Sequence, residues 1–154
     1  MHNAAVVIRR HGGPEVLQVE PVGLGAPGPG ELTLRQTFVG VNFHDIYVRS
    51  GQYRTLPLPG VPGIEGVGVV QRVGPGVQGF APGDRVGYIT AAYGCYARER
   101  VLPARLAVKL PEALSDMTAA SLLLKGLTVE MLVEAVHRVR PGDWVLVQAA
   151  AGGV

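Results

Sequence analysis

The stretch Pro62-Gly-Ile-Glu-Gly-Val-Gly-Val-Val-Gln-Arg-Val-Gly-Pro-Gly76 places a short β-type run between two Pro-Gly turns. Proline presets φ for the second position of a turn, and glycine tolerates the positive φ of the third. Seven Pro-Gly dipeptides occur along the chain. Short strands between closely spaced turns are typical of a small barrel or sandwich. We therefore expect residues 1–112 to form a mainly β domain, with strands at residues 5–9, 32–41, 66–73, 85–89 and 96–101.

The sequence changes character after Pro111 and predicts two helices. Ser115 is a suitable N-cap for a first helix over residues 116–124, and Gly126 is expected to interrupt it. Apolar residues recur at helical spacing in a second segment, residues 128–138. The predicted order is therefore a β domain followed by two linking helices.

The sequence then continues into Trp144-Val-Leu-Val-Gln-Ala-Ala-Ala-Gly-Gly-Val154. Residues 144–148 form a continuous apolar run, typical of a buried parallel strand. Small residues after such a strand let the backbone approach a pyrophosphate. We expect residues 113–154 to hold the linking helices and the first strand of a truncated dinucleotide-binding domain. The G-x-G-x-x-G matches at Gly23 and Gly74 contain proline and open no predicted helix, so we interpret them as turns.

Composition excludes several classes of function. The 154 residues carry a formal net charge of +2 without a long basic run, which argues against a nucleic-acid partner. No apolar stretch reaches the roughly 18 residues of a membrane-spanning helix. The N-terminus lacks the layout of a signal peptide, and the single cysteine, Cys95, excludes an internal disulfide. We expect a cytoplasmic protein.

Six motifs occur in order along the chain, and together they resemble one family. They are His11-Gly-Gly-Pro-Glu-Val-Leu17, Val41-Asn-Phe-His-Asp-Ile-Tyr-Val-Arg-Ser-Gly-Gln-Tyr53, Pro62-Gly-Ile-Glu-Gly-Val-Gly68, Pro82-Gly-Asp-Arg-Val86, Leu124-Lys-Gly-Leu-Thr-Val129 and Ala149-Ala-Ala-Gly-Gly-Val154. The chain resembles the N-terminal part of the zinc-free quinone oxidoreductase (zeta-crystallin-like) branch of the medium-chain dehydrogenase/reductase family. The resemblance implies a GroES-like β-barrel catalytic domain at residues 1–112, followed by the start of a Rossmann domain.

The residues themselves argue against a catalytic zinc. Zinc-dependent relatives place a cysteine where this chain has Asn42, and a histidine where it has Ile64. Such a site needs three protein ligands, commonly Cys, His or carboxylate, and neither asparagine nor isoleucine supplies one. We interpret Cys95 and His44 as structural residues, and we assign no catalytic role to Glu65, which matches a glutamate common in the family.

The resemblance also implies a site. Asn42, Tyr47 and Tyr53 would line a substrate pocket beside a nicotinamide, whereas the residues alone favour a barrel-edge asparagine and two half-buried tyrosines. The implied cofactor is NADPH, and its expected contacts are Asn42, Lys125, Thr128, Ala150, Gly152, Gly153 and Val154. Without the family, Lys125 is a solvated lysine between helices and Thr128 an N-cap.

The resulting hypothesis is an NADPH-dependent quinone reductase that transfers hydride to a quinone or conjugated carbonyl without zinc. The implied partners are that small-molecule substrate and, in the full-length protein, a second subunit of a homodimer; no nucleic acid or membrane partner is expected. One alternative is an enoyl or alkenal reductase of the same family. Another is an inactive GroES-like fragment that lacks the cofactor domain.

Overall fold

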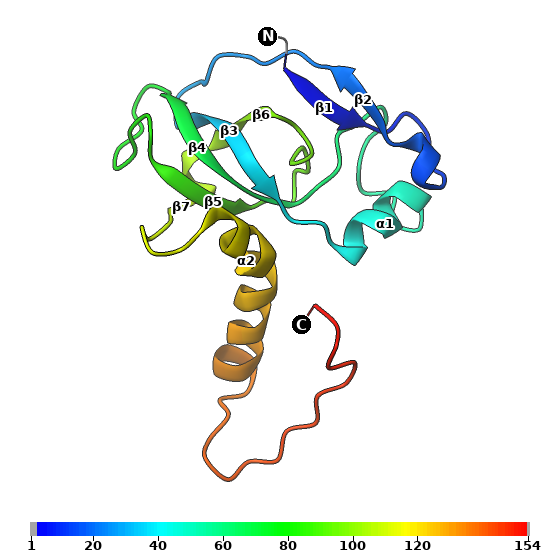
Figure 1. Ribbon diagram of the computed structural model, residues 1–154, viewed down its shortest axis with the longest axis vertical. Coiled ribbons are helices and arrows are strands. Elements are labelled where there is room, and N and C mark those ends of the chain that lie inside the picture. Colours follow the sequence, from blue (N-terminus) through cyan, green and yellow to red (C-terminus); the bar gives the residue numbers. More distant parts are fainter. Residues whose placement is uncertain (1–2, 154) are drawn as a thin grey trace.

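The computed structural model describes residues 3–153, which form two antiparallel sheets and two α-helices (Figure 1). The smaller sheet pairs β1 (Ala4–Val7) with β2 (Gln18–Pro21). The larger sheet has the order β6-β3-β4-β5-β7, with bounds β3 (Glu31–Val39), β4 (Glu65–Val73), β5 (Arg85–Ile89), β6 (Glu99–Pro103) and β7 (Ala107–Lys109). Two 3-10 turns, Pro14–Val16 and Ala104–Leu106, precede β2 and β7.

The two sheets remain separate and do not close into a continuous barrel. Backbone hydrogen bonds join the smaller sheet to the segments that precede β4 and β6, since the N–H of Val6 donates to Tyr96 O at 2.7 Å and Ile8 exchanges bonds with Gly60. All five predicted strands are present, and the strand at residues 85–89 has the predicted bounds. The strand predicted at 96–101 begins three residues later, because residues 96–98 lie beside β1 instead.

Helix α1 (Phe43–Ser50), between β3 and β4, was not predicted from the sequence. The Asp45 carboxylate accepts the backbone N–H of Asn42 at 2.9 Å and closes the first turn. Gly51 ends the helix with φ of 85°, a left-handed conformation that favours glycine. Both signals are present in the sequence, but the segment is only 8 residues long.

The two predicted linking helices form one continuous element, and the predicted interruption at Gly126 is wrong. Helix α2 runs over Asp116–Glu130 and passes into a π-helical turn over Met131–Val136. The Ser115 hydroxyl accepts the N–H of Thr118, as expected for an N-cap. A glycine inside a helix costs about 1 kcal/mol relative to alanine, which weakens a helix but does not end it.

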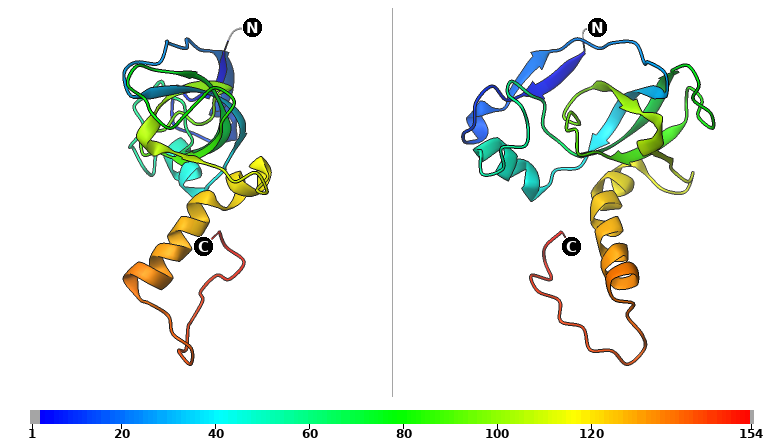
Figure 2. Two further views of the ribbon diagram at one scale, coloured as in Figure 1. Left: turned by 90° about the vertical axis from the view of Figure 1, so that its left-hand side faces the viewer. Right: turned by 180° about the vertical axis from the view of Figure 1, so that it is seen from behind.

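The strand predicted at residues 144–148 is absent from the described chain. The segment is extended without strand pairing, and the Trp144 side chain is 101% exposed. A strand requires a neighbour for its backbone N–H and C=O groups, and none lies beside these residues. Figures 1 and 2 show this segment leaving the end of α2 and returning along it towards the barrel.

Strand β4 is covered on both faces. Val67 packs against Ala119 and Ala120 of α2, whose small side chains allow the helix to lie close to the sheet. Val70 points to the opposite side and joins the main core with Leu34. The main core otherwise consists of Leu32, Val86, Tyr88, Cys95 and Leu102. Among the described residues, no helix is long and apolar enough to cross a membrane.

Arg85 fastens α2 to the larger sheet. Its Nε and Nη2 donate to Asp116 Oδ1 at 2.8 and 2.6 Å, and Nη2 also donates to the carbonyl of Leu114. Burial opposes ionisation of Asp116, but the hydrogen bonds from Thr37 and Arg85 outweigh it and hold the pKa of this carboxyl below its ordinary value. The pair thus fixes where α2 begins.

We predict that Arg85→Ala lowers the free energy of unfolding by about 1–3 kcal/mol at neutral pH, because a charge-assisted hydrogen-bonding centre is lost. Urea unfolding followed by circular dichroism measures the change. Since the pKa of Asp116 is lowered in the folded state, its contribution is present above the ordinary Asp range and is lost as pH falls through the lowered value. The difference between variant and wild type should therefore shrink at acidic pH.

The matched control is Arg9→Ala. Arg9 also pairs with a carboxylate, that of Glu20 at 2.7 Å, but its side chain is 66% exposed against 30% for Arg85. Exposed pairs contribute little to stability. Equal effects of the two substitutions would contradict the anchoring role of Arg85.

Candidate active site

Asn42 is held at both its backbone and its side chain. It caps the N-terminus of α1, and its backbone N–H is bound by Asp45. Its side-chain Nδ2 donates to Glu65 Oε1 at 2.7 Å. This contact orients the amide, leaving Oδ1 and the second N–H of Nδ2 as its remaining polar groups.

Glu65, the first residue of β4, is 1% exposed and accepts hydrogen bonds at both carboxylate oxygens. Besides Asn42, its partner is the backbone N–H of Leu124 in α2, which donates to Oε2 at 3.0 Å. Gly40 lies directly against the same carboxylate: a Cβ at this position would be 2.2 Å from Oε1. Three separate segments therefore meet at Glu65.

Tyr47 and Tyr53 form a pair of aromatic rings at the C-terminal side of α1. Their ring centroids are 5.0 Å apart, and the N–H of Tyr53 donates to Tyr47 O at 3.0 Å. Phe43 packs edge-on against Tyr47 at 5.2 Å. The Tyr53 side chain is 43% exposed, so the pair presents aromatic surface to solvent.

His44 lies between this pair and a buried tyrosine, Tyr93. Its ring stacks on Tyr93 with a centroid distance of 5.9 Å and lies 5.6 Å from Tyr53. The Tyr93 hydroxyl contacts His44 Nε2 at 3.2 Å and also bonds to the Thr55 hydroxyl. Tyr93 has a positive φ of 57°, rare for a tyrosine, so these contacts hold a strained residue.

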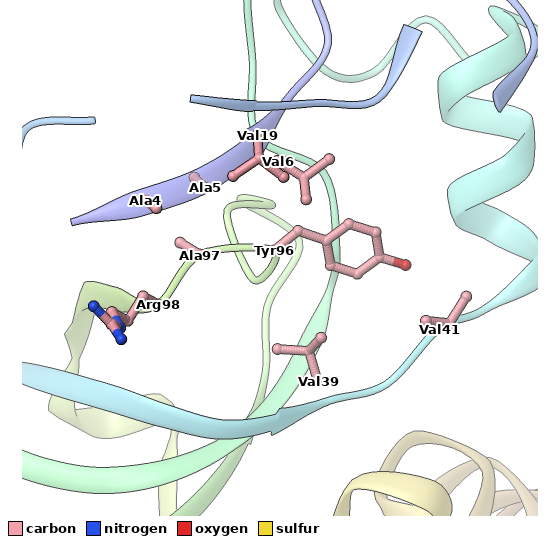
Figure 3. Close-up of a pocket in the computed structure, with 9 residues that line it drawn as sticks. All are labelled: Ala4, Ala5, Val6, Val19, Val39, Val41, Tyr96, Ala97 and Arg98. Atoms are coloured by element: carbon pink, nitrogen blue, oxygen red, sulfur yellow. The ribbon is translucent and has the colours of Figure 1, made fainter. Parts of the chain in front are cut away.

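An open apolar pocket of about 380 Å³ lies between the small sheet and the end of β3 (Figure 3). The Tyr96 ring lies between Val6 and Val39 in it, and the Tyr96 hydroxyl donates to Asp45 Oδ2 at 2.9 Å. Burial, followed by the nearby charge of Asp45, raises the pKa of Tyr96 and keeps this donor protonated. The remaining lining residues are Ala4, Ala5, Val19, Val41, Ala97 and Arg98.

The residues expected to contact the cofactor are only partly brought together. Lys125 lies on α2, directly after the residue that binds Glu65, and a Cβ on Gly153 would be 3.0 Å from its side chain. Ala150 and Gly152 lie in the exposed turn before Gly153.

Thr128 and Val154 are the other two of these expected cofactor contacts. Thr128 is not an N-cap: it lies inside α2, and its hydroxyl donates to Leu124 O at 2.8 Å. Val154 lies outside the described residues.

The comparisons with known proteins identify the family. Residues 28–112, more than half of the chain, match the alcohol dehydrogenase GroES-like domain family. A solved quinone oxidoreductase from Pseudomonas syringae pv. tomato DC3000 superposes with a TM-score of 0.93 at 44% identity, covering 98% of this chain and 46% of that one. The chain belongs to the medium-chain dehydrogenase/reductase family through its alcohol dehydrogenase GroES-like domain.

Two further relatives extend the comparison. The 2-haloacrylate reductase of a Burkholderia species is 44% identical over 97% of this chain and 46% of its own length. The Escherichia coli quinone oxidoreductase in complex with NADPH superposes with a TM-score of 0.87 at 38% identity, over 91% of this chain and 43% of that one. The chain thus spans less than half the length of the curated relatives it matches. The GroES-like, mainly β fold predicted from the motifs is confirmed.

Glu65, His44 and Tyr93 make contacts in the site that the sequence did not indicate. A charged residue flanked by Gly63 and Gly66 in an apolar strand was the available signal for Glu65. Such a residue is buried only when its polar atoms find partners. No local pattern joins His44 to Tyr93, because 49 positions separate them.

We predict that Gly40→Ala destabilises the protein and displaces Glu65, because the added Cβ would lie 2.2–2.5 Å from three atoms of that side chain. Small-to-large changes in packed sites typically cost about 1–3 kcal/mol. Gly23→Ala is the control, since a Cβ there meets nothing within 4 Å. Thermal unfolding of both variants provides the comparison, and a Gly40→Ala variant as stable as Gly23→Ala would refute the close approach.

Proposed function

We propose that this chain provides the substrate side of an NADPH-dependent reductase that transfers hydride to a quinone or another conjugated carbonyl without a zinc ion. The observation that carries the proposal is the Asn42 amide, fixed on a buried carboxylate at the N-cap of the short helix that carries Tyr47, whose ring contacts that of Tyr53 at a tilted angle. The similarity to quinone oxidoreductases from several bacteria supports it.

The site residues would bind and orient a flat carbonyl substrate. Tyr47 and Tyr53 offer aromatic faces for a quinone ring, and their hydroxyls can donate to its oxygens. One Asn42 N–H is held by Glu65, so the second N–H is the donor that remains for a carbonyl oxygen. Donors already oriented before reaction stabilise the charge that develops on that oxygen.

NADPH, when bound, supplies the hydride. The residues present fit such a group on one observation: the small-residue turn at Gly153 lies close to the Lys125 side chain, with a Cβ built on Gly153 3.0 Å from Lys125 Cε. A basic side chain beside a backbone segment without bulky side chains suits a pyrophosphate. Lys125, Ala150, Gly152, Gly153 and Val154 are its proposed contacts, with Asn42 at the nicotinamide side. The NADPH complex of the Escherichia coli relative supports the choice of cofactor. Thr128 would act as an acceptor through its hydroxyl oxygen, because the hydroxyl hydrogen is bound within α2.

The absence of a catalytic zinc is part of the proposal. Ile64 offers no ligand atom, and both Glu65 oxygens already accept N–H groups. Within residues 3–153, no three His, Cys, Asp or Glu side chains gather in a group able to hold a metal ion. We also propose the domain division at residue 112 and assembly of the complete enzyme as a homodimer.

A second candidate activity is reduction of an activated alkene, which the similarity to 2-haloacrylate reductase favours. Both reactions place negative charge on a carbonyl or carboxyl oxygen, so the Asn42 and tyrosine donors suit either. The aromatic pair favours the quinone. The third possibility is a non-catalytic protein that retains only the GroES-like fold.

A direct test follows NADPH oxidation by the longest gene product that contains this sequence, with a chelator present throughout. Turnover of a naphthoquinone above that of an enoyl acid or haloacrylate supports the proposal. Preference for the alkene acids selects the second candidate. Absence of NADPH binding, measured by nicotinamide fluorescence, selects the non-catalytic possibility, and loss of activity on chelation rejects the zinc-free mechanism.

We predict that Asn42→Ala lowers kcat/KM for the quinone by on the order of a hundredfold, the usual effect of losing one oriented donor. Asn3→Ala is the control: the Asn3 side chain also makes two hydrogen bonds, both to the Glu99 backbone at 2.9 Å, but it lies outside the site. Steady-state kinetics of both variants decide. Unchanged kcat/KM in Asn42→Ala would reject the pocket assignment.

A further inference from the structure

We propose that Glu65 is the positioning residue of this site: it fixes the orientation of the Asn42 amide and joins that amide to the turn of α2 that carries Lys125. The inference rests on the proposed function, because it assigns Glu65 a task in that same site. It differs from the sequence-based view, in which Glu65 had no assigned role. Glu65 itself would not touch the reacting atoms.

Both carboxylate oxygens of Glu65 are bound. A buried carboxylate is costly unless its oxygens are bound, and Glu65, 1% exposed, uses one oxygen for each of two N–H donors. The donors come from different elements, the N-terminus of α1 and the middle of α2. Only a side chain with two acceptor oxygens can serve both, since a glutamine would turn its own N–H2 towards one of the donors.

The contact with Glu65 sets the direction of the Asn42 amide. An asparagine side chain can turn over and exchange its oxygen with its nitrogen. The carboxylate at 2.7 Å from Nδ2 selects one orientation, because the reversed amide would place Oδ1 against Oε1. Glu65 therefore determines which polar atoms Asn42 presents on its other side.

Glu65 is also bound to α2, through the backbone N–H of Leu124. Leu124 precedes Lys125 directly, so the bond from its N–H to Glu65 fixes the helical turn from which Lys125 projects. The bond is possible because Ala119 and Ala120 let the helix lie close to β4. One carboxylate thus sets the relative positions of the proposed substrate donor and the proposed cofactor contact.

The experiment compares Glu65→Gln with Glu31→Gln in the complete protein. Glu31 is a matched control, since its Oε2 also accepts a backbone N–H, from Gly28 at 2.9 Å, at a point remote from Asn42. We expect kcat/KM to fall on the order of tenfold to a hundredfold in Glu65→Gln, the range for misplaced reacting groups. Glu31→Gln should keep wild-type kinetics.

A double-mutant cycle separates positioning from general structural damage. If Glu65 acts through Asn42, adding Glu65→Gln to Asn42→Ala should lower kcat/KM by clearly less than Glu65→Gln does alone, since one of the two groups that Glu65 positions is already gone. Fully additive losses would overturn the proposal. So would a Glu65→Gln variant that loses thermal stability while retaining wild-type kcat/KM.

A measurement independent of activity keeps this inference separate from the proposed function. In nitrogen-labelled protein, the Asn42 side-chain amide and the Leu124 backbone amide should both show shifted resonances and slow hydrogen exchange. Glu65→Gln should change both sites together, whereas Glu31→Gln should change neither. If these signals behave as expected but no acceptor is reduced, the proposed function fails and the Glu65 link stands. If the Asn42 amide is unaffected by Glu65→Gln, the link fails whatever the activity.

Discussion

Strand β4 carries α2 on one face and the main core on the other, and the remaining structure is arranged around this double burial. Val67 and Val70 point to opposite sides and pack into separate clusters. The strand also contains Gly66 and Gly68, where a side chain would collide with neighbouring atoms of β3 or β5. The close packing that glycine permits buries the start of β4, and Glu65, which is 1% exposed, finds its partners inside the protein.

The site follows from that constraint. Asn42 and Leu124 are distant in sequence, but each supplies an N–H to one oxygen of a buried carboxylate. Arg85 performs a comparable task at the surface, where it binds Asp116 and the carbonyl of Leu114 and sets the start of α2. The helix is thus fixed to the sheet at its first turn and again at its middle.

The sequence predicted those features that depend on local chemistry. Pro-Gly turns located the strands, and Ser115 located the start of α2, because turns and caps are made by neighbouring residues. The helix continued through Gly126 because the cost of one glycine is small beside the packing of Ala119 and Ala120. The strand at 144–148 failed because pairing depends on a second strand. Asn42 was named from a family motif, but its partner Glu65 came from the fold, because 23 positions separate them.

The exposure of Trp144 has a practical consequence for spectroscopy. It is the only tryptophan of the chain, and it lies in the segment that follows α2, outside the three buried clusters. Its emission therefore reports the surroundings of that segment and should change little when the β core unfolds. Unfolding of the core is followed instead by the signals of buried tyrosines such as Tyr88 and Tyr93. A blue shift of this emission would record burial of the segment, and quenching by iodide would measure how far that burial has proceeded.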